Sequence, residues 1–318
     1  MTRAAIGIDI GGTKIAAGIV NLETGAVSHP ETRPTAPERG GEAVLEDCRE
    51  LVEELGAWGT QHEPDFDVAG IGIGVPELVD RAGRVRSAFQ FDWMHLALPR
   101  ELAGLGPVAI ASDVRAAALA EATFGAAQGA ESALYLSVGT GISSCLLLDG
   151  QPYVGAHGNA LVMGTGPTVV IDPATGNSVS HVLEEVASGP ALARRYRLAA
   201  RREVSGAEEV LDLASGGDLR AIAVVSSAAL ALGNAIGHLV NVLDPEIVII
   251  GGGLGLAGGR FRDATERAMR TTIWSDDSRH MPLVSSRLGT EAGLIGAALS
   301  MVSTPGSEHH HLLEGAMR

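Results

Sequence analysis

The hydrophobic positions of the chain follow two patterns: short apolar runs that end at glycine or proline, and longer stretches in which apolar residues recur every three to four positions. The first pattern is typical of buried β-strands and the second of helices. We expect strands at 4–10, 15–20, 68–75, 107–111, 133–138, 142–148 and 246–250. We expect helices at 44–55, 114–125, 182–197, 221–243 and 291–301. This alternation indicates an α/β protein with mixed sheets.

The same plan opens two parts of the chain: an apolar strand, a glycine-rich turn and a second strand. Asp9 lies near the end of the first strand in one hairpin, and Ser137 takes the equivalent place in the other, 128 residues later. We therefore expect two related halves. By contrast, the segment 155–182 is dominated by Gly, Pro, Thr and Ser, and there we expect loops.

Composition narrows the class of protein. A length of 318 residues predicts about two domains, and a hydrophobic content of 46% argues against disorder. The 42 glycines are about 13% of the chain against a usual ~7%, which indicates tight turns and close backbone approach to a ligand. The 23 basic and 38 acidic residues give a net charge of −15. A nucleic-acid partner is therefore not expected, because phosphate-backbone binding needs a basic surface.

Cysteine content and apolar segments indicate a cytoplasmic protein with no membrane partner. Cys48 and Cys145 provide neither a disulfide framework nor metal-ligand spacing. Asp9 interrupts the early apolar stretch, so we expect no secretory signal. The apolar segment 221–250 is broken by asparagine, histidine, aspartate and proline, which predicts a buried helix followed by a strand. The run His309–His311 is more typical of a solvated tail than of a metal site.

The segment Asp9-Ile10-Gly11-Gly12-Thr13-Lys14 has the composition of a phosphate-binding turn. Gly11 and Gly12 let the backbone approach a phosphate, and consecutive N–H groups can form an anion-binding nest. Thr13 adds a hydroxyl and Lys14 a positive charge. Asp9 can hold a hydrated Mg²⁺. An ordinary glycine-rich hairpin turn explains this segment, taken alone, equally well.

Two further glycine clusters favour nucleotide binding. Gly139-Thr140-Gly141 forms the turn of the second hairpin, and two such turns can hold one polyphosphate from both sides. Gly251-Gly252-Gly253 follows a buried strand and suits close approach to a base or ribose. A Walker-type loop is excluded, because Thr13-Lys14 stands in reversed order and precedes a strand. The lone G-x-G-x-x-G at 253–258 is weak evidence for a dinucleotide enzyme.

Ser112-Asp113 is the candidate for chemistry, because it follows the strand 107–111 and precedes an Ala-rich helix. A carboxylate there can accept a proton from a substrate hydroxyl while a nucleotide supplies the phosphoryl group. Either residue can instead cap the helix, and spacing alone favours that simpler interpretation.

Eight motifs occur in an order that is specific as a set. They are DIGGTK at 9–14, GIGVP at 72–76, SDVRAAALAEATFGAA at 112–127, LSVGTGI at 136–142, YVGAHGN at 153–159, LEEVASGPAL at 183–192, DPEIVIIGGGL at 244–254 and AGLIGAA at 292–298. In this order the chain resembles, over nearly its full length, the ROK family of sugar kinases (repressors, open reading frames, kinases). That family belongs to the actin-like ATPase and sugar kinase superfamily.

The resemblance implies an α/β fold of two actin-like (ribonuclease H-like) domains with mixed sheets and a central cleft. The implied domains are 1–113, joined by a C-terminal helix at about 299–318, and 114–298. The cleft would close over ATP, Mg²⁺ and a sugar, with the three glycine loops on the nucleotide and Asp9 on Mg²⁺ through water. Asp113 becomes the general base, which overturns the helix-cap interpretation, and we expect a homodimer.

The chain departs from the family on the sugar side. Ser112 stands where the family has Asn, and Val162-Met163-Gly164-Thr165 stands where it has Glu-Ile-Gly-His. The family's zinc-binding stretch is replaced by Thr175–Val182, which has no cysteine, so we expect no structural zinc. The expected substrate-binding residues are Ser112, Asp113, Gly158, Thr165 and Glu184.

These departures favour a modified ring, an aminosugar or a C7-cyclitol, since a hydroxyl without its partner in a closed site loses affinity. Glucose or N-acetylmannosamine stays open as substrate if another polar side chain fills the gap. The candidates for that role are Asp92, Arg115, His157 and His181. A non-catalytic sugar- or nucleotide-binding pseudo-kinase is a further alternative, disfavoured because Asp9 and Asp113 are both present. A DNA-binding repressor is not expected, given the acidic charge and a first glycine loop that begins at residue 9.

Overall fold

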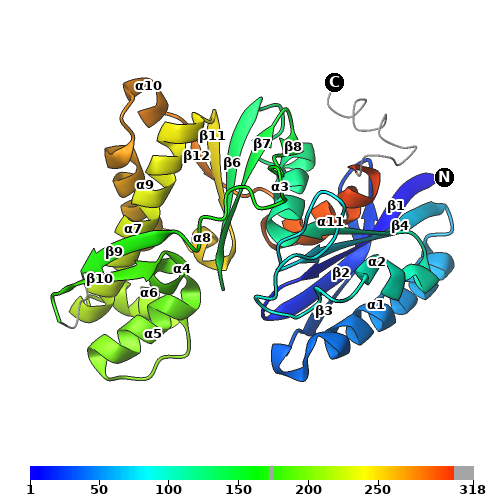
Figure 1. The fold of residues 1–318 in the computed structure, drawn as a ribbon, viewed down its shortest axis with the longest axis horizontal. Helices are drawn as coiled ribbons and strands as arrows, with labels where there is room; N and C mark the ends of the chain where they lie inside the picture. Colours follow the sequence, from blue (N-terminus) through cyan, green and yellow to red (C-terminus); the bar gives the residue numbers. More distant parts are fainter. Residues whose placement is uncertain (172–174, 304–318) are drawn as a thin grey trace. The chain divides into compact units, whose positions relative to one another are not determined.

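The structure is a computed structural model that describes residues 1–171 and 175–303 (Figure 1). Contacts divide the chain into two compact units. Unit 1 comprises Met1–Gly129, Leu147–Ala160 and, among the described residues, 290–303. Unit 2 comprises Ala130–Leu146 and Leu161–Gly289. The run His309–His311 lies outside the described residues.

Unit 1 is built on a five-stranded sheet of order β3-β2-β1-β4-β5. Its strands are β1 (Thr2–Ile10), β2 (Lys14–Asn21), β3 (Val27–Pro34), β4 (Phe66–Val75) and β5 (Val108–Ser112). The strands β1, β4 and β5 run parallel, and β2 and β3 continue the sheet as antiparallel strands. The sequences of β1 and β4 are continuous apolar runs because helices cover both faces of the sheet.

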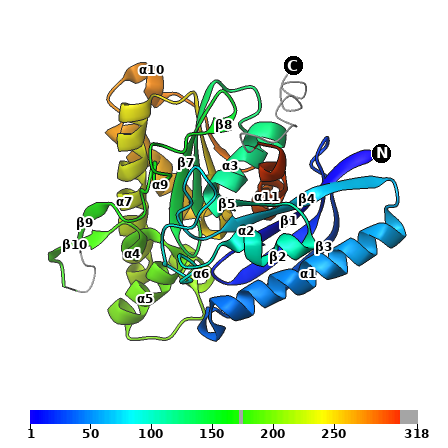
Figure 2. The ribbon, with the colours of Figure 1, turned by 45° about the vertical axis from the view of Figure 1, so that its right-hand side comes forward.

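One long helix, α1 (Gly41–His62), covers one face of this sheet, and α3 (Asp113–Phe124) and α11 (Ala292–Ser303) lie on the other (Figure 2). Helix α1 buries residues at helical spacing, among them Leu45, Cys48 and Leu55. The shorter elements of this unit are η1 (Pro37–Arg39), α2 (Leu98–Glu101) and η2 (Ala103–Leu105), and η3 (Gly289–Glu291) spans the point where unit 2 ends and unit 1 resumes.

The second sheet has the order β12-β11-β6-β7-β8. Its strands are β6 (Ser132–Val138), β7 (Ile142–Leu148), β8 (Gln151–Pro152), β11 (Ile247–Gly251) and β12 (Leu283–Ser285). Taken from the β8 edge, this order repeats that of the first sheet, again with a parallel group, here β6, β11 and β12. The mixed sheets of the predicted fold class are thus present in both halves.

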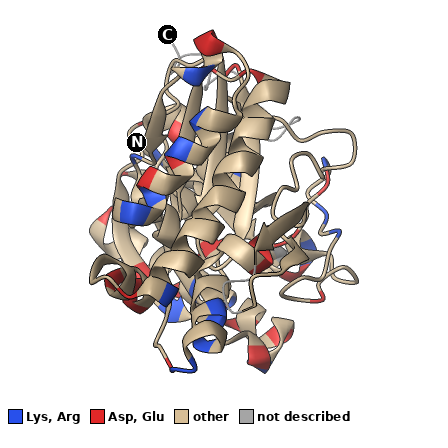
Figure 3. Cartoon of the chain, turned by 90° about the vertical axis from the view of Figure 1, so that its left-hand side faces the viewer, with Lys and Arg blue, Asp and Glu red and all other residues tan. Residues whose placement is uncertain are grey.

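The core of unit 2 forms around α7 (Leu219–Leu243), which packs along α9 (Gly259–Thr272). Helix α7 is long and apolar enough to cross a membrane by length and composition, but half of that stretch is buried inside the unit. Figure 3 shows it as a helix almost without charged residues beside the more charged α9. The other helices are α4 (Glu184–Ala187), α5 (Gly189–Ala200), α6 (Ala207–Ser215), α8 (Gly253–Leu256) and α10 (Asp276–Arg279).

Two local expectations were wrong, and one helix had not been expected. The segment 155–182 is not all loop, since β9 (Pro167–Ile171) and β10 (Ser178–Val182) pair as an antiparallel hairpin. The helix expected at 182–197 is two helices, because Ser188 is extended and caps α5 by accepting the N–H of Ala191. Helix α9 was not expected, because its many charged residues conceal a narrow buried stripe.

Helix α3 belongs to unit 1, although the expected domain boundary fell before it. The cause is close packing of α3 on α11, where a Cβ at Gly296 would lie 1.7 Å from the carbonyl oxygen of Ala116. Helix α11 approaches the sheet equally closely, since a Cβ at Gly72 would lie 1.7 Å from the carbonyl oxygen of Ala297. Helix α11 begins at Ala292, within one residue of the expected start at 291, and runs to Ser303.

We predict that Gly296→Ala lowers the free energy of unfolding by about 2 kcal/mol or more, because the added methyl group overlaps backbone that cannot move without shifting a helix. Thermal unfolding followed by circular dichroism measures this change. Gly56→Ala in α1 is the matched control, since a Cβ there meets nothing within 4 Å. It should be neutral or stabilising by up to about 1 kcal/mol. Equal stabilities of the two variants would contradict the packing described here.

Candidate active site

Two aspartates lie at the same edge of the unit 1 sheet. Asp9 is opposite Gly74 in the parallel pairing of β1 with β4, and Ser112, which precedes Asp113, is opposite Val75 in the pairing of β4 with β5. A Cβ at Gly74 would lie 3.4 Å from Oδ1 of Asp9 and 3.6 Å from Cα of Asp113. Gly74 therefore separates the two aspartates and leaves the space between them free of a side chain.

The two carboxyl groups have raised pKa values. Burial, and to a smaller extent the negative charge of Asp9, raise the pKa of Asp113 from 3.8 to about 7. Burial also raises the pKa of Asp9 to about 6, against a smaller lowering by Lys14. Two carboxylates that repel each other in a partly desolvated place can act as a proton acceptor and a cation ligand.

The first glycine loop is closed by a backbone hydrogen bond, and Thr35 donates hydrogen bonds to two of its carbonyl groups. The N–H of Gly11 donates to the carbonyl of Lys14 at 2.9 Å. Fully buried Thr35 donates its hydroxyl to the carbonyl of Gly11 at 2.7 Å, and its N–H donates to the carbonyl of Thr13 at 3.0 Å. Sequence reasoning missed Thr35, which lies just beyond the end of β3 and carries no motif. Thr13 and Lys14 are exposed.

Helix α11 packs closely against the side chain of Asp9. A Cβ at Gly293 would lie 2.2 Å from Oδ2 of Asp9, so only glycine leaves room for this carboxylate. The donor set fits Mg²⁺, which prefers one or two carboxylates and keeps several waters. Among residues 1–171 and 175–303, no group of three or more His, Cys, Asp or Glu side chains is placed to hold a metal ion.

The second and third glycine loops lie together in unit 2. Ser137 pairs with Gly251 between the parallel strands β6 and β11, the same arrangement that Asp9 and Gly74 have in unit 1. Gly252 has φ 79°, and a Cβ there would lie 2.5 Å from the carbonyl oxygen of Val138. A Cβ at Gly139 would lie 3.6 Å from the backbone nitrogen of Gly253, so the two loops are neighbours.

Glu184 lies beside the second loop. Its Oε2 accepts the N–H of Ile142 at 2.8 Å, and a Cβ at Gly141 would lie 2.7 Å from the same oxygen. The backbone N–H of Glu184 donates to the carbonyl of Gly164 at 2.9 Å, which brings the segment 162–165 to this place. Glu184, Thr165 and the loop 139–141 are thus grouped in unit 2.

The segment 162–165 is less polar than a Glu and a His would make it. Val162 is 41% exposed and lines an apolar hollow of about 400 Å³ with Met163 and residues of α7. The hydroxyl of exposed Thr165 has only a 3.5 Å bond to the carbonyl of Val162.

The remaining predicted substrate residues belong to unit 1. Arg115 donates from Nε to the hydroxyl of Ser112 at 3.2 Å and from Nη2 to the carbonyl of Val79 at 2.6 Å. Gly158 packs on the same backbone, with φ 83° and a Cβ position 2.4 Å from the carbonyl oxygen of Val79. Arg115 thus connects Ser112, the neighbour of Asp113, to the backbone on which Gly158 packs.

Of the four side chains considered as gap fillers, only Arg115 bonds to a predicted site residue in the described part of the chain. Asp92 lies 3.7 Å from His95, and His181 lies 3.5 Å from Glu185. His157 lines a separate hollow with three arginines.

Glu77 acts electrostatically on Asp113, and sequence reasoning missed it. Its carboxylate is 3% exposed and accepts the hydroxyl of Ser87 and the N–H groups of Phe89, Gln90 and Phe91, the last three at 2.7 to 2.9 Å. Its charge also contributes to the raised pKa of Asp113. The sequence feature that could have identified Glu77 is its position, two residues after the buried strand β4, at the sheet edge where Asp9 and Asp113 lie.

A family profile, a curated relative and solved structures each match almost the whole chain. The ROK family profile matches residues 5–303. The glucokinase of Thermotoga maritima is 30% identical, over 92% of this chain and 95% of that protein. The ROK hexokinase of Thermus thermophilus is 35% identical with a TM-score of 0.75, covering 93% of this chain and 97% of that one. A ROK glucokinase of Streptomyces griseus, solved with glucose and AMPPNP, is 28% identical with a TM-score of 0.76, over 93% and 98%.

The chain belongs to the ROK family. The predicted fold of actin-like domains and the predicted class, an ATP-dependent carbohydrate kinase, are both confirmed by these ROK relatives. The structure places Asp9–Lys14, Ser112, Asp113 and Gly158 in unit 1. It places Gly139–Gly141, Gly251–Gly253, Thr165 and Glu184 in unit 2. The roles of these residues stay predictions.

We predict that Asp113→Asn stabilises the ROK protein at pH 8 in the absence of nucleotide and metal. Because the folded-state pKa of Asp113 lies above its unfolded value of 3.8, the free energy of unfolding falls as the pH rises from about 4 through about 7. Asparagine removes this loss, which should raise the free energy of unfolding by about 1 kcal/mol or more at pH 8.

The measurement is the unfolding temperature of wild type and variant at pH 5 and pH 8. The gain should be larger at pH 8, since at pH 5 most of the wild-type Asp113 is still protonated. Exposed Asp67→Asn is the control and should change stability by less than about 0.5 kcal/mol. A variant less stable than wild type at pH 8 would show that Asp113 is not electrostatically strained.

Proposed function

We propose that this ROK protein transfers the γ-phosphoryl group of ATP to a primary hydroxyl of a hexose-like substrate, with Asp113 as the general base. The observation that carries the proposal is the placement of Asp9 and Asp113 at one sheet edge, separated only by Gly74. A base with a pKa near 7 is half ionised at neutral pH and can accept the proton of a hydroxyl.

The glycine loops would hold ATP. Gly11, Gly12, Thr13 and Lys14 offer backbone N–H groups, a hydroxyl and an ammonium to phosphate oxygens. Gly139-Thr140-Gly141 offers the same kind of backbone in unit 2, and the neighbouring Gly251-Gly252-Gly253 suits the ribose or base. Mg²⁺ when bound neutralises phosphate charge, and Asp9 would hold it through water.

On the acceptor side we propose an aminosugar or a C7-cyclitol. Val162 and Thr165 offer neither a carboxylate nor an imidazole, and the carboxylate of Glu184 already accepts the N–H of Ile142 through one oxygen. A ring that presents fewer hydroxyls here loses less than glucose does. Glucose and N-acetylmannosamine are the alternative acceptors. We also propose a cytoplasmic homodimer without structural zinc and without a nucleic-acid or membrane partner.

The proposed base is tested by Asp113→Asn, which should lower kcat about 10²-fold or more, the usual contribution of a general base. The affinity for ATP should change little, since Asp113 lies on the acceptor side of the proposed reaction. Turnover is measured by coupled ADP release in a screen of hexoses, aminohexoses and cyclitols, with Asp67→Asn as control. Near-normal turnover of Asp113→Asn rejects the assignment, and no turnover of the wild type with any acceptor favours a pseudo-kinase.

The proposed acceptor is tested by the double variant Val162→Glu, Thr165→His. Native kcat/KM for glucose should lie on the order of 10²-fold below that for the true substrate, if one or two partnered hydroxyls are at stake. The double variant should shift the ratio of kcat/KM values toward glucose. Val242→Glu, Thr271→His introduces the same side chains at exposed positions of α7 and α9 and should leave the ratio unchanged. A native enzyme that uses glucose as well as any aminosugar or cyclitol contradicts the proposed specificity.

A further inference from the structure

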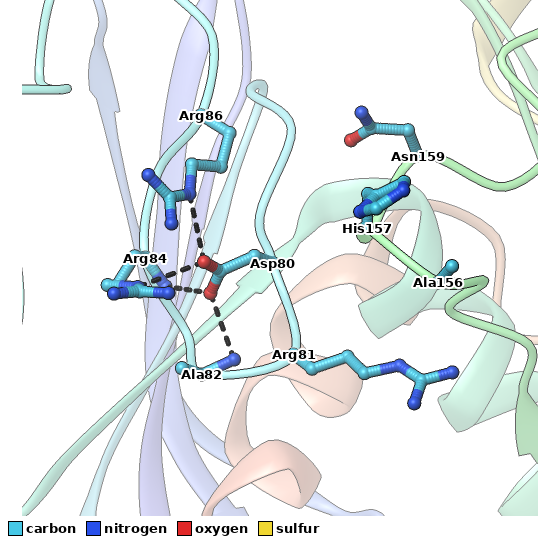
Figure 4. A pocket seen from close by; sticks show the side chains of 8 residues that line it. All are labelled: Asp80, Arg81, Ala82, Arg84, Arg86, Ala156, His157 and Asn159. Carbon is cyan, nitrogen blue, oxygen red and sulfur yellow. Dashed lines mark hydrogen bonds and ion pairs between the residues drawn. The ribbon is translucent and has the colours of Figure 1, made fainter.

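A hollow of about 450 Å³ in unit 1 gathers three arginines that the proposed kinase chemistry does not use (Figure 4). One wall is the turn 80–86, which carries Arg81, Arg84 and Arg86. The other wall is the segment 156–159, from which His157 and Asn159 extend. The volume falls within the range of small-molecule sites, and the local positive charge contrasts with a chain of net charge −15.

The arginine-bearing turn is held in one conformation by Asp80. Its Oδ1 accepts the N–H groups of Ala82 and Arg84 at 2.9 and 3.0 Å, and its own N–H donates to the carbonyl of Arg84 at 2.9 Å. A bridge between Val79 and Val85 closes the turn at its base. The wall of the hollow is therefore preorganised, which reduces the entropy that a ligand must overcome.

Asp80 also orients two of the guanidinium groups. Its Oδ2 accepts Nε–H of Arg84 and Nε–H of Arg86, each at 2.9 Å, and these bonds help to lower its pKa. The side chain of Asp80 is 12% exposed, whereas those of Arg84 and Arg86 are 67% and 49% exposed. Arg81 donates Nε–H to the carbonyl of Gly155 at 2.8 Å. Each arginine is thus fixed through Nε.

Fixing an arginine through Nε leaves its terminal Nη groups available as donors. Within residues 1–171 and 175–303, the Nη atoms of Arg81, Arg84 and Arg86 have no hydrogen-bonding partner in the protein. Guanidinium groups match the oxygens of phosphate in geometry and charge, and here Arg84 and Arg86 share a single carboxylate while Arg81 bonds to a backbone carbonyl. The donors and the net positive charge select an oxyanion with several acceptor oxygens.

We propose that this hollow is a binding site for a phosphate group, free or carried as a monoester, with Arg84 and Arg86 as its principal ligands. His157 and Asn159 on the opposite wall would contact the polar groups that the ester carries. The phosphate can come from inorganic phosphate or from a phosphorylated sugar, which share this chemistry. Binding at this site does not depend on the proposed kinase activity.

The site has a direct connection to the proposed base. Val79, which precedes Asp80, accepts Nη2–H of Arg115, and Arg115 in turn donates to Ser112, the neighbour of Asp113. Gly158 packs on Val79 from the other wall. On the proposed function, a ligand that moves either wall changes the position of Ser112 and alters kcat for the acceptor. Phosphate binding in the hollow does not require this effect on kcat, so the two are tested separately.

The test is isothermal titration of the full-length protein with inorganic phosphate, glucose 6-phosphate and glucose, in the presence of AMPPNP and Mg²⁺ to occupy the nucleotide loops. Wild type should bind phosphate and glucose 6-phosphate saturably. Arg84→Gln, Arg86→Gln should raise both dissociation constants about 10-fold or more, as expected for the loss of charged hydrogen bonds, and should leave that of glucose unchanged. A lower dissociation constant for glucose 6-phosphate than for phosphate identifies the sugar ester as the preferred source.

Arg220→Gln, Arg267→Gln is the matched control, because it removes two exposed arginines from unit 2 and the same total charge. It should leave both dissociation constants within about twofold of wild type, because distant surface charges affect binding only weakly. Unfolding temperatures verify that both double variants are folded. Absence of saturable phosphate binding by wild type overturns the proposal, and so does equal weakening by the two double variants.

Discussion

The structure of unit 1 is organised around the burial of two carboxylates, Asp9 and Asp113, that the sheet brings to one edge. Parallel pairing of β1, β4 and β5 fixes where these residues lie, so the fold cannot separate them without breaking a strand. Burial raises their pKa values to about 6 and 7, and the negative charge of Asp9 adds to the shift of Asp113. A cation bound at Asp9 would relieve the repulsion and leave Asp113 ionised, which is the form a base needs.

Glycine makes this arrangement possible, and it does so through close packing rather than through backbone flexibility. A side chain at Gly74 would enter the space between the aspartates, and one at Gly293 would displace the carboxylate of Asp9. Gly296 and Gly72 bring α11 onto α3 and β4 within backbone contact, which holds Gly293 at the required depth. The position of α11 and the geometry around Asp9 therefore depend on the same close contacts. This dependence explains part of the unusual glycine content.

Much of the fold and part of the candidate site could be predicted from the sequence because their signals are local. The turn at Asp9–Lys14 and the strand before Asp113 are each contained in a few consecutive residues, and the two hairpins repeat the same local plan. The role of Glu77 could not be predicted in this way, because its partners lie 10 to 14 residues further along in an irregular segment. Thr35 and Gly293 were missed for a similar reason, since each acts on the first loop or on Asp9 from another element.

Unit 1 contains two electrostatic environments of opposite sign, connected through a few backbone groups. At the sheet edge, Asp9, Asp113 and Glu77 concentrate negative charge, and the charges of Asp9 and Glu77 raise the pKa of Asp113. In the turn 80–86, the guanidinium groups of Arg84 and Arg86 bond to one carboxylate, and hydrogen bonds lower the pKa of Asp80. Arg115 lies between the two, with one bond to Ser112 and one to Val79. The negative charge that raises the pKa of Asp113 and the positive charge of the turn 80–86 are therefore kept apart along one short stretch of chain.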